Sequence, residues 1–509
     1  MQHFESANPR TRRIGLFSAT GLAAAALSIA SLGVGGCDPG ATIADKKEKP
    51  FAGVALKVRC PDRAFADAIT PIAKTWAART GATVVWVPPN DPDPDVLVLP
   101  AAEIGLWAER DELLPVPPAI KEAAHPYQWQ TVLPVYRGEQ LAGWGRQIYA
   151  LPLVGDGHVI VYRADRFADP VVVAEFQKEV KRKLDVPNTW EDYAEVAAFF
   201  SRLDKKPALP LPDDPARLAD LFFRVAACYD RPALGEDTVG GPANAKNPAP
   251  AQDVLAFQFH TDSGKPRLSA AGFKAAAEWL AGLKARGAIP EGGSADPVAA
   301  LADGRAVMAV VSLAELIRLP RENGQVPARF AVAPLPGTRR YFDASGKEVS
   351  SDSNYVPYFS GGRFGIVRKG CAQPDAAFDL LAEIGGPGRS LELISTPGLG
   401  AGPFRDNHLD QDRLLIWLGY GFDEDRSKAL QESLKGYIRR AVRNPVYGLR
   451  GPDQEKLTAA LAVELKAIAS GTVPPEPGLE RAVKAWDELS AGVPPERLIQ
   501  WRRRAVGLS

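Results

Sequence analysis

The sequence predicts an α/β fold built around a mainly parallel sheet. After residue 53 the order is a strand at 54–58, a helix through 65–76, and strands at 82–87 and 95–99. This alternation is typical of parallel sheets whose faces are covered by helices. Of the 509 residues, 46% are hydrophobic and 24% are charged, as in globular proteins. Because one compact core seldom holds a chain of this length, we expect two lobes or domains.

The first helix is predicted from a single apolar face. Its apolar residues are spaced by 4, 3 and 4 positions and are Phe65, Ile69, Ile72 and Trp76. Gly81 should end this helix, and Pro71 should kink or restart it. Three other tryptophans, Trp190, Trp279 and Trp486, also occupy helical positions. We therefore expect all four tryptophan side chains in the core.

The same alternation continues along the chain with interruptions. Further strands are expected at 147–153, 158–162, 208–211, 307–311, 329–333 and 364–367. Further helices are expected from Thr189 to Phe200, around 273–283, from Pro374 to Gly385, at 457–468 and around Trp486. Residues 231–252 are rich in Gly, Pro, Asn and Ala and should form a loop.

The first 36 residues have the pattern of an export signal. Arg10, Arg12 and Arg13 precede Ile14–Gly36, an uncharged stretch rich in Ala, Gly, Leu and Ser. The arginine pair is similar to the twin-arginine export signal, although Gly15 stands where that signal usually has Phe. An uncleaved membrane anchor is the alternative, because this uncharged stretch is just long enough to span a bilayer.

The export signal runs into a cysteine. Val34-Gly35-Gly36-Cys37 resembles a bacterial lipobox, in which the cysteine is lipidated and becomes the mature N-terminus. The abundance of Ala and Gly over Leu and Ile favours cleavage over a permanent anchor. We predict a signal peptide at 1–36, lipidation at Cys37 and a flexible tether at 37–52. The protein should then be exported and held at the cell membrane or in the periplasm.

The charge balance argues against nucleic acid as a partner. The chain has 61 Lys+Arg and 61 Asp+Glu, and removal of residues 1–36 leaves a net charge of −2. Proteins that bind nucleic acid need a large basic surface, which this composition does not supply.

Beyond Cys37 the cysteines are Cys60, Cys228 and Cys371. The sequence allows either a disulfide between Cys60 and Cys228 or free thiols at both positions.

Several short segments share their order with one known family. They are 147–153 (QIYALPL), 161–167 (VYRADRF), 187–193 (PNTWEDY), 301–309 (LADGRAVMA), 333–337 (APLPG), 361–362 (GG) and 373–377 (QPDAA). Together they resemble the extracellular solute-binding proteins of ABC importers, which include maltose-binding protein and other sugar-binding lipoproteins. The resemblance covers about residues 53–490. The sequence differs from the family pattern at 231–252 and at Arg163-Ala164. These differences affect the prediction of the ligand class more than the prediction of the fold.

The resemblance implies a two-lobed, periplasmic-binding-protein-like fold with discontinuous lobes that close around a ligand. The expected first lobe comprises 53–156 and 313–370, and the expected second lobe comprises 157–312 and 403–509. The chain should cross between lobes near Gly155–Gly157, Val311–Leu313 and Gly398–Phe404, because glycine and short extended segments absorb hinge motion.

The candidate ligand-binding residues combine carboxylates, aromatics and glycines, as sugar recognition requires. They are Asp62, Glu103, Trp144, Asp156, Tyr355, Tyr358, Gly361 and Gly362. Asp62 and Glu103 follow the first and third strands, where ligands collect in open α/β sheets. Asp156 lies with His158 at the first crossing. The stretch 355–362 resembles the family segment that brings an aromatic and a glycine pair to the cleft.

Enzymatic chemistry finds little support in the sequence. It has no G-x-S-x-G, H-E-x-x-H, C-x-x-C or P-loop motif, and its histidines are isolated. We therefore expect no catalytic residue, cofactor or metal. The resemblance implies a monomer that captures a small polar solute, above all a carbohydrate, and delivers it to an ABC permease. The alternatives are a sensory or scavenging lipoprotein of the same fold and, more remotely, a secreted hydrolase.

Overall fold

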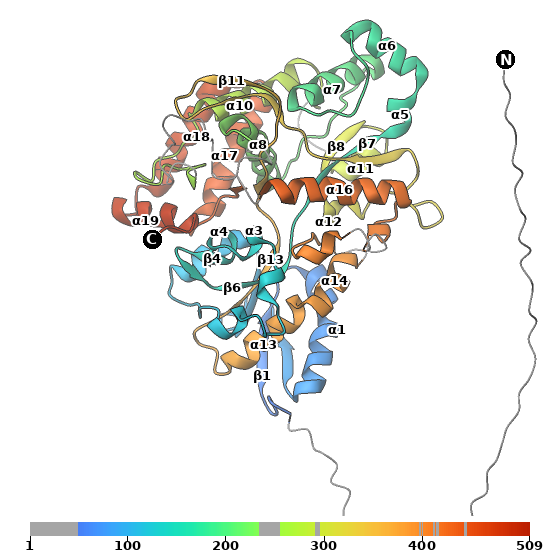
Figure 1. Ribbon diagram of the computed structural model, residues 1–509. Helices are drawn as coiled ribbons and strands as arrows, with labels where there is room; N and C mark the ends of the chain where they lie inside the picture. The colour runs from blue at the N-terminus through green and yellow to red at the C-terminus, as the bar shows by residue number, and fades with distance from the viewer. Residues whose placement is uncertain are drawn as a thin grey trace, which may run out of the picture. The chain divides into compact units, whose positions relative to one another are not determined.

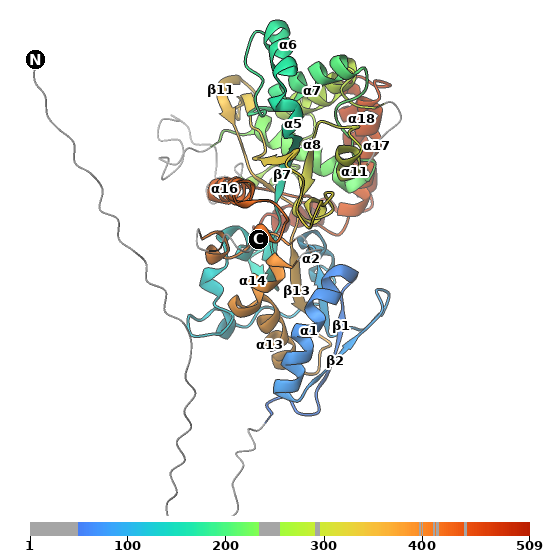
Figure 2. The same cartoon turned by 90° about the vertical axis from the view of Figure 1, so that its right-hand side faces the viewer.

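Figures 1 and 2 show a computed structural model of the chain. It describes residues 49–233, 255–290, 296–396, 399, 401–410, 413, 417–441 and 445–509. The predicted signal peptide, Cys37 and most of the tether lie outside these residues, as does most of the predicted loop at 231–252. In the part of the chain that is described, every helix is too short or too polar to cross a membrane.

The first lobe is built on a five-stranded sheet. Its order is β2 (Thr83–Trp86), β1 (Ala55–Arg59), β3 (Val96–Leu99), β13 (Arg363–Val367) and β6 (Ala150–Val154). β1 runs parallel to β2 and β3, whereas β13 is antiparallel to β3 and β6. The sheet is therefore mixed, because β13 runs against the direction of both of its neighbours.

Helices cover this sheet and bury their apolar faces. The long ones are α1 (Arg63–Thr80), α2 (Ala101–Ala108), α13 (Pro374–Gly385) and α14 (Pro387–Ser395). The short elements are η1 (Pro118–Lys121), η2 (Trp129–Thr131), α3 (Pro134–Arg137), α4 (Glu139–Ala142), β4 (Gly143–Trp144), β5 (Gln147–Ile148) and η3 (Asp406–Leu409). α13 packs against α1 and β6, so the chain returns to this lobe late in the sequence.

The second lobe is built on a three-stranded antiparallel sheet. β7 (His158–Arg163) lies between β8 (Met308–Ser312) and β9 (Phe330–Ala333). A separate antiparallel ribbon, β10 (Thr338–Phe342) with β11 (Glu348–Asn354), packs on the helical layer. A third pairing joins β12 (Tyr358–Phe359) in parallel to β14 (Val446–Tyr447).

The second lobe also holds most of the helices. They are α5 (Ala164–Ala168), α6 (Pro170–Val180), α7 (Trp190–Asp204), α8 (Pro215–Asp230), α10 (Ala271–Ala285), α11 (Pro297–Ala302), α12 (Leu313–Leu316), α16 (Glu424–Ala441), α17 (Gln454–Ala469), α18 (Pro475–Ser490) and α19 (Pro495–Ala505). α8 and α10 pack against each other and against α17, and α16 covers β7 and β9. Figure 1 draws this lobe above the first one.

The chain passes between the sheets at the links that form the hinge. Residues 155–157 join β6 to β7, and residues 355–362, which contain β12, join the β10–β11 ribbon to β13. A later passage follows η3 and precedes α16. The links pack tightly: a Cβ added to Gly361 or to Gly402 would lie 2.4 Å from atoms of Asp156. Glycine is therefore required at both positions.

The second crossing lies elsewhere than the sequence indicated. The sequence placed it at Val311–Leu313 and assigned 313–370 to the first lobe. Instead, β9 pairs with β7, so the chain stays in the second lobe until the 355–362 link. A short apolar strand such as β9 could join the sheet of either lobe. Its pairing with a strand distant in sequence decides which sheet it joins.

Other local predictions are confirmed or corrected by packing. Trp76, Trp190, Trp279 and Trp486 are all buried, as predicted. α1 continues across Pro71 without interruption, although a kink or restart was expected there. Residues 208–211 form no strand, but Ala208 and Leu209 hydrogen-bond to the Ala288 carbonyl oxygen. The possible disulfide between Cys60 and Cys228 is not formed, and both side chains remain thiols.

Candidate functional site

A cavity of about 490 Å³ lies between the lobes, beside the hinge links. Its lining from the first lobe consists of Ala101, Ala102, Leu141 and Arg363. The links contribute Asp156, His158, Tyr358, Phe359, Ser360 and Gly361. The second lobe contributes residues of α8, α10, α11, β8 and the 209–212 loop, and the segment Gly448–Arg450 with the start of α17 completes the wall. A ligand bound there would contact both lobes.

The second-lobe wall of this cavity is mainly aliphatic. Its apolar residues are Leu209, Pro210, Leu211, Pro212, Leu221, Leu283, Pro297 and Val310. The aromatic lining residues are Tyr193, Phe223, Trp279, Tyr358 and Phe359, and all five are buried. Apolar parts of a ligand would therefore rest on aliphatic side chains more than on exposed aromatic rings.

The polar wall begins on helix α8. The Asp214 carboxylate caps this helix by accepting a hydrogen bond from the Arg217 amide at 2.9 Å. One turn further, Asp220 and Arg224 lie four residues apart and share one face. Arg224 Nε donates to Asp220 Oδ2 at 2.7 Å, and Arg224 Nη1 donates to the Tyr358 carbonyl oxygen at 3.0 Å. The helix thus brings an ion pair of a buried arginine and a half-buried aspartate to the second hinge link.

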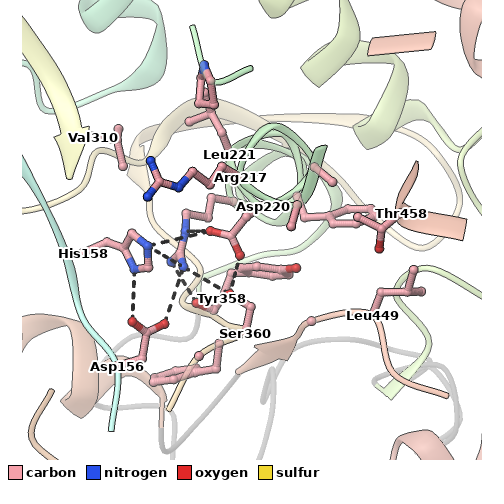
Figure 3. Close-up of a pocket in the computed structure, with 18 of the residues that line it drawn as sticks. Asp156, His158, Arg217, Asp220, Leu221, Val310, Tyr358, Ser360, Leu449 and Thr458 are labelled. Atoms are coloured by element: carbon pink, nitrogen blue, oxygen red, sulfur yellow. Dashed lines mark hydrogen bonds and ion pairs between the residues drawn. The ribbon is translucent and has the colours of Figure 1, made fainter. Parts of the chain in front are cut away.

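Residues of both described links complete an ionic network around Arg224. Figure 3 labels four of its members, Asp156, His158, Asp220 and Ser360. Ser360 Oγ donates to Asp220 Oδ1. Arg224 Nη2 lies 3.8 Å from Asp156 Oδ2 and 3.4 Å from His158 Nε2. His158 Nδ1 lies 3.6 Å from Asp156 Oδ1. We call Asp156, His158, Asp220, Arg224 and Ser360 the hinge cluster.

Burial and charge set the protonation states of the hinge cluster. Burial alone would raise the pKa of Asp220, but Arg224, His158 and the hydrogen bond from Ser360 together hold the pKa below its usual value. Burial alone would lower the pKa of Arg224, and Asp220, Tyr437 and Asp156 together reverse that shift. The pKa of His158 is lowered by burial and by Arg224, despite the opposing charge of Asp156. His158 is therefore neutral at pH 7.

Asp156 is held in place mainly through its backbone. Its amide donates to the Tyr136 hydroxyl oxygen at 2.8 Å, and Asp156 Oδ1 accepts from the Gly157 amide at 2.7 Å. Asp156 Oδ2 and His158 Nδ1 are buried and have no hydrogen-bond partner. Such atoms are costly to leave unsatisfied. These two atoms are the polar atoms of the hinge cluster that remain able to form a hydrogen bond in this conformation.

Two further ion pairs stand on opposite walls of the cavity. On the second lobe, Arg217 Nη1 lies 2.7 Å from Glu315 Oε1, and both side chains line the cavity. On the first lobe, Arg363 lines the cavity and its Nη2 lies 2.7 Å from Asp62 Oδ2. Each guanidinium near the hinge thus has a carboxylate beside it.

Asp62 and Glu103 stand behind the cavity wall. Asp62 is the N-cap of α1, where Oδ1 accepts from the Phe65 amide at 3.2 Å, and its Oδ2 binds Arg363. Glu103 lies in the first turn of α2, and its pKa is raised by burial despite the charge of Arg59. Neither side chain belongs to the lining. Asp62 supports the first-lobe wall through Arg363.

The other predicted residues fall into two groups. Asp156, Tyr358 and Gly361 line the cavity, and the Tyr358 ring lies 5.2 Å from the Arg224 guanidinium. Trp144, Tyr355 and Gly362 do not line it. Trp144 is buried, and its Nε1 donates to Glu109 at 2.7 Å. Gly362 has φ +98°, which favours glycine for backbone reasons.

Sequence reasoning missed Arg217, Asp220, Arg224, Ser360 and Arg363. Asp220 and Arg224 carry a local signal, an ion-pair spacing of four on an amphipathic helix, but surface helices show the same spacing. Only the position of α8 against the links distinguishes them. The residues that the structure describes contain no group of three His, Cys, Asp or Glu side chains placed to hold a metal ion.

Comparison with known proteins identifies a family. The sequence profile described as bacterial extracellular solute-binding protein matches residues 83–413. No curated protein matches the chain by sequence.

Solved structures resemble the fold. The sugar-binding protein MalE from Xanthomonas citri has 14% identity and a TM-score of 0.62, with 86% of this chain and 98% of that chain covered. The cyclic α-maltosyl-1,6-maltose binding protein from Arthrobacter globiformis has 15% identity and a TM-score of 0.59, with 86% and 98% covered. A solute-binding protein from Agrobacterium radiobacter K84 in complex with ribitol has 15% identity and a TM-score of 0.58, with 87% and 100% covered.

Proposed function

Because the chain belongs to the bacterial extracellular solute-binding protein family, we propose that it captures a carbohydrate in the interlobe cavity and delivers it to an ABC permease. The observation that carries this proposal is the cavity itself, which draws its walls from both lobes and from the hinge links. A ligand in such a cavity bridges the lobes. It therefore stabilises the closed arrangement in proportion to its differential affinity for that arrangement.

The charge pattern supports a neutral, hydroxyl-rich ligand. The pairs Arg224–Asp220, Arg217–Glu315 and Arg363–Asp62 each cancel a charge. A carboxylate accepts hydrogen bonds from sugar hydroxyls, and a guanidinium donates to them. An anionic or cationic solute that bound at one of these three pairs would have to separate it. The aliphatic wall opposite them offers a surface for the apolar face of a sugar ring.

The ligand contacts we propose are those predicted residues that line the cavity, joined by four that the sequence did not reveal. They are Asp156, Tyr358, Gly361, Arg217, Asp220, Ser360 and Arg363. Asp62 and Glu103 act behind them, Asp62 by orienting Arg363. Sugars are also named for the structurally similar proteins, which bind cyclic α-maltosyl-1,6-maltose in one case and the polyol ribitol in another.

The membrane side of the proposal rests on the sequence. A lipid on Cys37 would hold a monomer near its permease, with residues 37–52 as the tether. Replacing Cys37 by Ser should move the protein from the membrane fraction to the soluble periplasmic or culture fraction. Mass spectrometry of the wild-type N-terminal peptide should find the acyl chains. A Cys37→Ser protein that stays membrane-bound would contradict the lipid anchor.

Ligand binding is tested by isothermal titration calorimetry on the exported chain. The panel comprises maltose, acarbose, tagatose, ribitol, amino acids and organic acids. We expect at least one neutral sugar or polyol to bind and to raise the melting temperature, because a ligand selective for the folded state stabilises it. We expect the recovered ligand to be unchanged. Hydrolysis products in the same samples would support a hydrolase instead.

A matched pair of variants locates the site. Asp220→Asn should weaken binding at least about tenfold, because it removes a charged acceptor from the cavity wall. Asp303→Asn alters an exposed carboxylate paired with Arg305, outside the cavity lining, and should leave binding unchanged. Equal losses in both variants would place the ligand elsewhere.

A further inference from the structure

A second contact between the lobes lies on the cavity wall, apart from the hinge links. It starts at β14, which pairs with β12 of the second link. The Gly448 amide donates to the Phe359 carbonyl oxygen at 2.7 Å, and residues Gly448–Arg450 then line the cavity. The segment continues into α17, which packs on α8 and α10 of the second lobe.

Arg450 extends from this segment into the first lobe. Its buried guanidinium donates to carbonyl oxygens of Ala101 at 3.2 Å, Leu141 at 3.3 Å and Gly143. It also donates to Gln140 and, at 3.0 Å, to Ala505 at the end of α19. One side chain thus joins the start of α2, the α4–β4 segment and the C-terminal helix.

The electrostatics of Arg450 differ from those of an ordinary ion pair. Within the described part of the chain it forms no salt bridge, and burial lowers its pKa to about 9. Its charge is compensated by carbonyl dipoles. The planar guanidinium has five N–H donors in a fixed fork, which matches several converging carbonyls. A lysine at this position would supply three donors from one point.

Helix α19 reinforces this contact from the outside. Arg504 Nη1 lies 2.6 Å from Glu109 Oε1, which also accepts from Trp144 Nε1, and the Gly145 amide donates to the Arg504 carbonyl oxygen at 2.8 Å. Burial alone would raise the pKa of Glu109, but the hydrogen bonds from Trp144 and Arg504 lower it. Glu109 is therefore ionised at neutral pH.

The same helix is fixed to the second lobe. Arg502 binds Asp453, which precedes α17, through two hydrogen bonds of 2.9 and 2.6 Å. The Arg502 guanidinium also lies 3.8 Å from the centre of the Phe259 ring. α19 and the Gly448–Arg450 segment are therefore anchored in both lobes at once. We call them the clasp.

We propose that Arg450 is a positioning residue for ligand binding, and that the clasp holds the two lobes in the approach that forms the ligand cavity. This inference rests on the proposed function, because it assigns a role at the same site. The clasp favours the binding-competent arrangement before ligand arrives. Apparent affinity falls in proportion to the population of that arrangement, so loss of the clasp weakens binding by lowering that population.

Two measurements on Arg450→Lys test the proposal in the full exported chain. The first is the dissociation constant for the tightest-binding sugar or polyol of the panel. The second is the interlobe distance distribution, from electron paramagnetic resonance between spin labels at Lys74 on α1 and Lys178 on α6, with Cys37 and Cys60 replaced by Ser. Both labelled positions are exposed and lie on different lobes. We expect binding weakened about tenfold and a broader distance distribution in the absence of ligand.

Arg405→Lys is the matched control. Arg405 is also buried and also donates to carbonyl oxygens, those of Gly385, Gln128 and Tyr127. All these partners lie in the first lobe, so this variant should lower the melting temperature and leave the ligand-free distance distribution unchanged. If Arg450→Lys behaves like Arg405→Lys in both measurements, Arg450 is merely structural and the proposal is overturned.

Milder variants keep the test decisive if Arg450→Lys fails to fold. Arg504→Gln removes the outer ion pair and should broaden the distances in the same direction, by less. An unchanged distribution in that variant overturns the clasp. If the wild-type chain binds none of the panel, the proposed function fails, while the distance measurements still decide whether the clasp holds the lobes.

Discussion

The hinge cluster and the clasp each bury an arginine between the lobes, but they compensate its charge in different ways. Arg224 in the hinge cluster is paired with Asp220, and that carboxylate raises the pKa of Arg224 above its ordinary value. Arg450 in the clasp binds carbonyl oxygens alone, and burial lowers its pKa to about 9. Because the hinge cluster depends on ionised side chains, its stability should change with pH and with the loss of either charged partner. Because Arg450 depends on several converging carbonyl oxygens, the stability of the clasp should change with the position of those carbonyls.

The largest effect should come from breaking the buried pair of the hinge cluster. Arg224→Met leaves the half-buried Asp220 without its cation and should lower the free energy of unfolding by about 3 kcal/mol, the lower end of the range for buried pairs. Urea denaturation measures this change. Arg305→Met, in an exposed pair with Asp303, should cost about 0–1 kcal/mol. Equal costs would mean that Asp220 and Arg224 are in effect solvated, which would remove the contrast with the clasp.

The packing of the hinge links predicts the next largest effect. A Cβ on Gly361 would lie 2.4 Å from the Asp156 carboxylate, so Gly361→Ala should destabilise the fold by about 1–3 kcal/mol. It should also weaken ligand binding, since it displaces the second link. Gly388→Ala is the control, because no atom lies within 4 Å of an added Cβ there. A neutral Gly361→Ala would show that the links separate easily.

Protonation should act on the hinge cluster and spare the clasp, whose segments contain no histidine. The pKa of His158 is lowered in the fold by burial and by Arg224, so the unfolded chain binds more protons below about pH 6.5. Facing His158 are Arg224, Asp156, Asp220 and Glu315. Stability should therefore fall as the pH drops below about 6.5.

Buried His408 of the first lobe adds to this slope, because burial lowers its pKa to about 3. Each group contributes at most about 1.4 kcal/mol per pH unit within its window. Denaturation series at pH 7.5, 6.5, 5.5 and 4.5 on wild type, His158→Gln and His408→Gln separate the two. We expect a shallower slope in each variant and the shallowest in the double variant. A His158→Gln slope equal to wild type would mean that His158 keeps its ordinary pKa.

The smallest effect should come from the outer edge of the clasp. The Arg504 side chain is 39% exposed, so Arg504→Gln should cost about 0.5–1 kcal/mol of stability. Raising the salt concentration to 1 M should reduce the difference between variant and wild type, because screening weakens exposed charge pairs. Thermal melts of both proteins in low and high salt measure this. A loss as large as that of Arg224→Met would make the Glu109 contact comparable to the hinge cluster.

Local sequence patterns predicted much of the fold. The apolar face of α1 and its stop at Gly81 are encoded within twenty residues and were predicted. The alternation of strands and helices predicted the α/β class, and the family resemblance implied the two lobes. Lobe assignment failed at β9, because nothing local distinguishes a strand of one sheet from a strand of the other.

The candidate site was only partly predictable for the same reason. Asp156 and Gly361 could be found, because glycine-rich turns and a family segment mark the links. Asp220 and Arg224 sit on an ordinary amphipathic helix, and their role depends on where α8 meets Ser360. Trp144 was predicted as a ligand contact but packs against the clasp: its ring lies beside Arg450, and its indole N–H donates to Glu109, the partner of Arg504.

The sequence by itself determined the elements, the family and the residues able to turn tightly or carry charge, because these follow from neighbours a few positions apart. Only the tertiary structure decided which charges meet. Asp220 and Ser360 are 140 positions apart, and Arg450 and Ala101 are 349 positions apart. Contacts of that range depend on how whole helices and sheets pack, and no local pattern records their outcome. The cavity, the hinge cluster and the clasp therefore belong to the fold and not to any single segment.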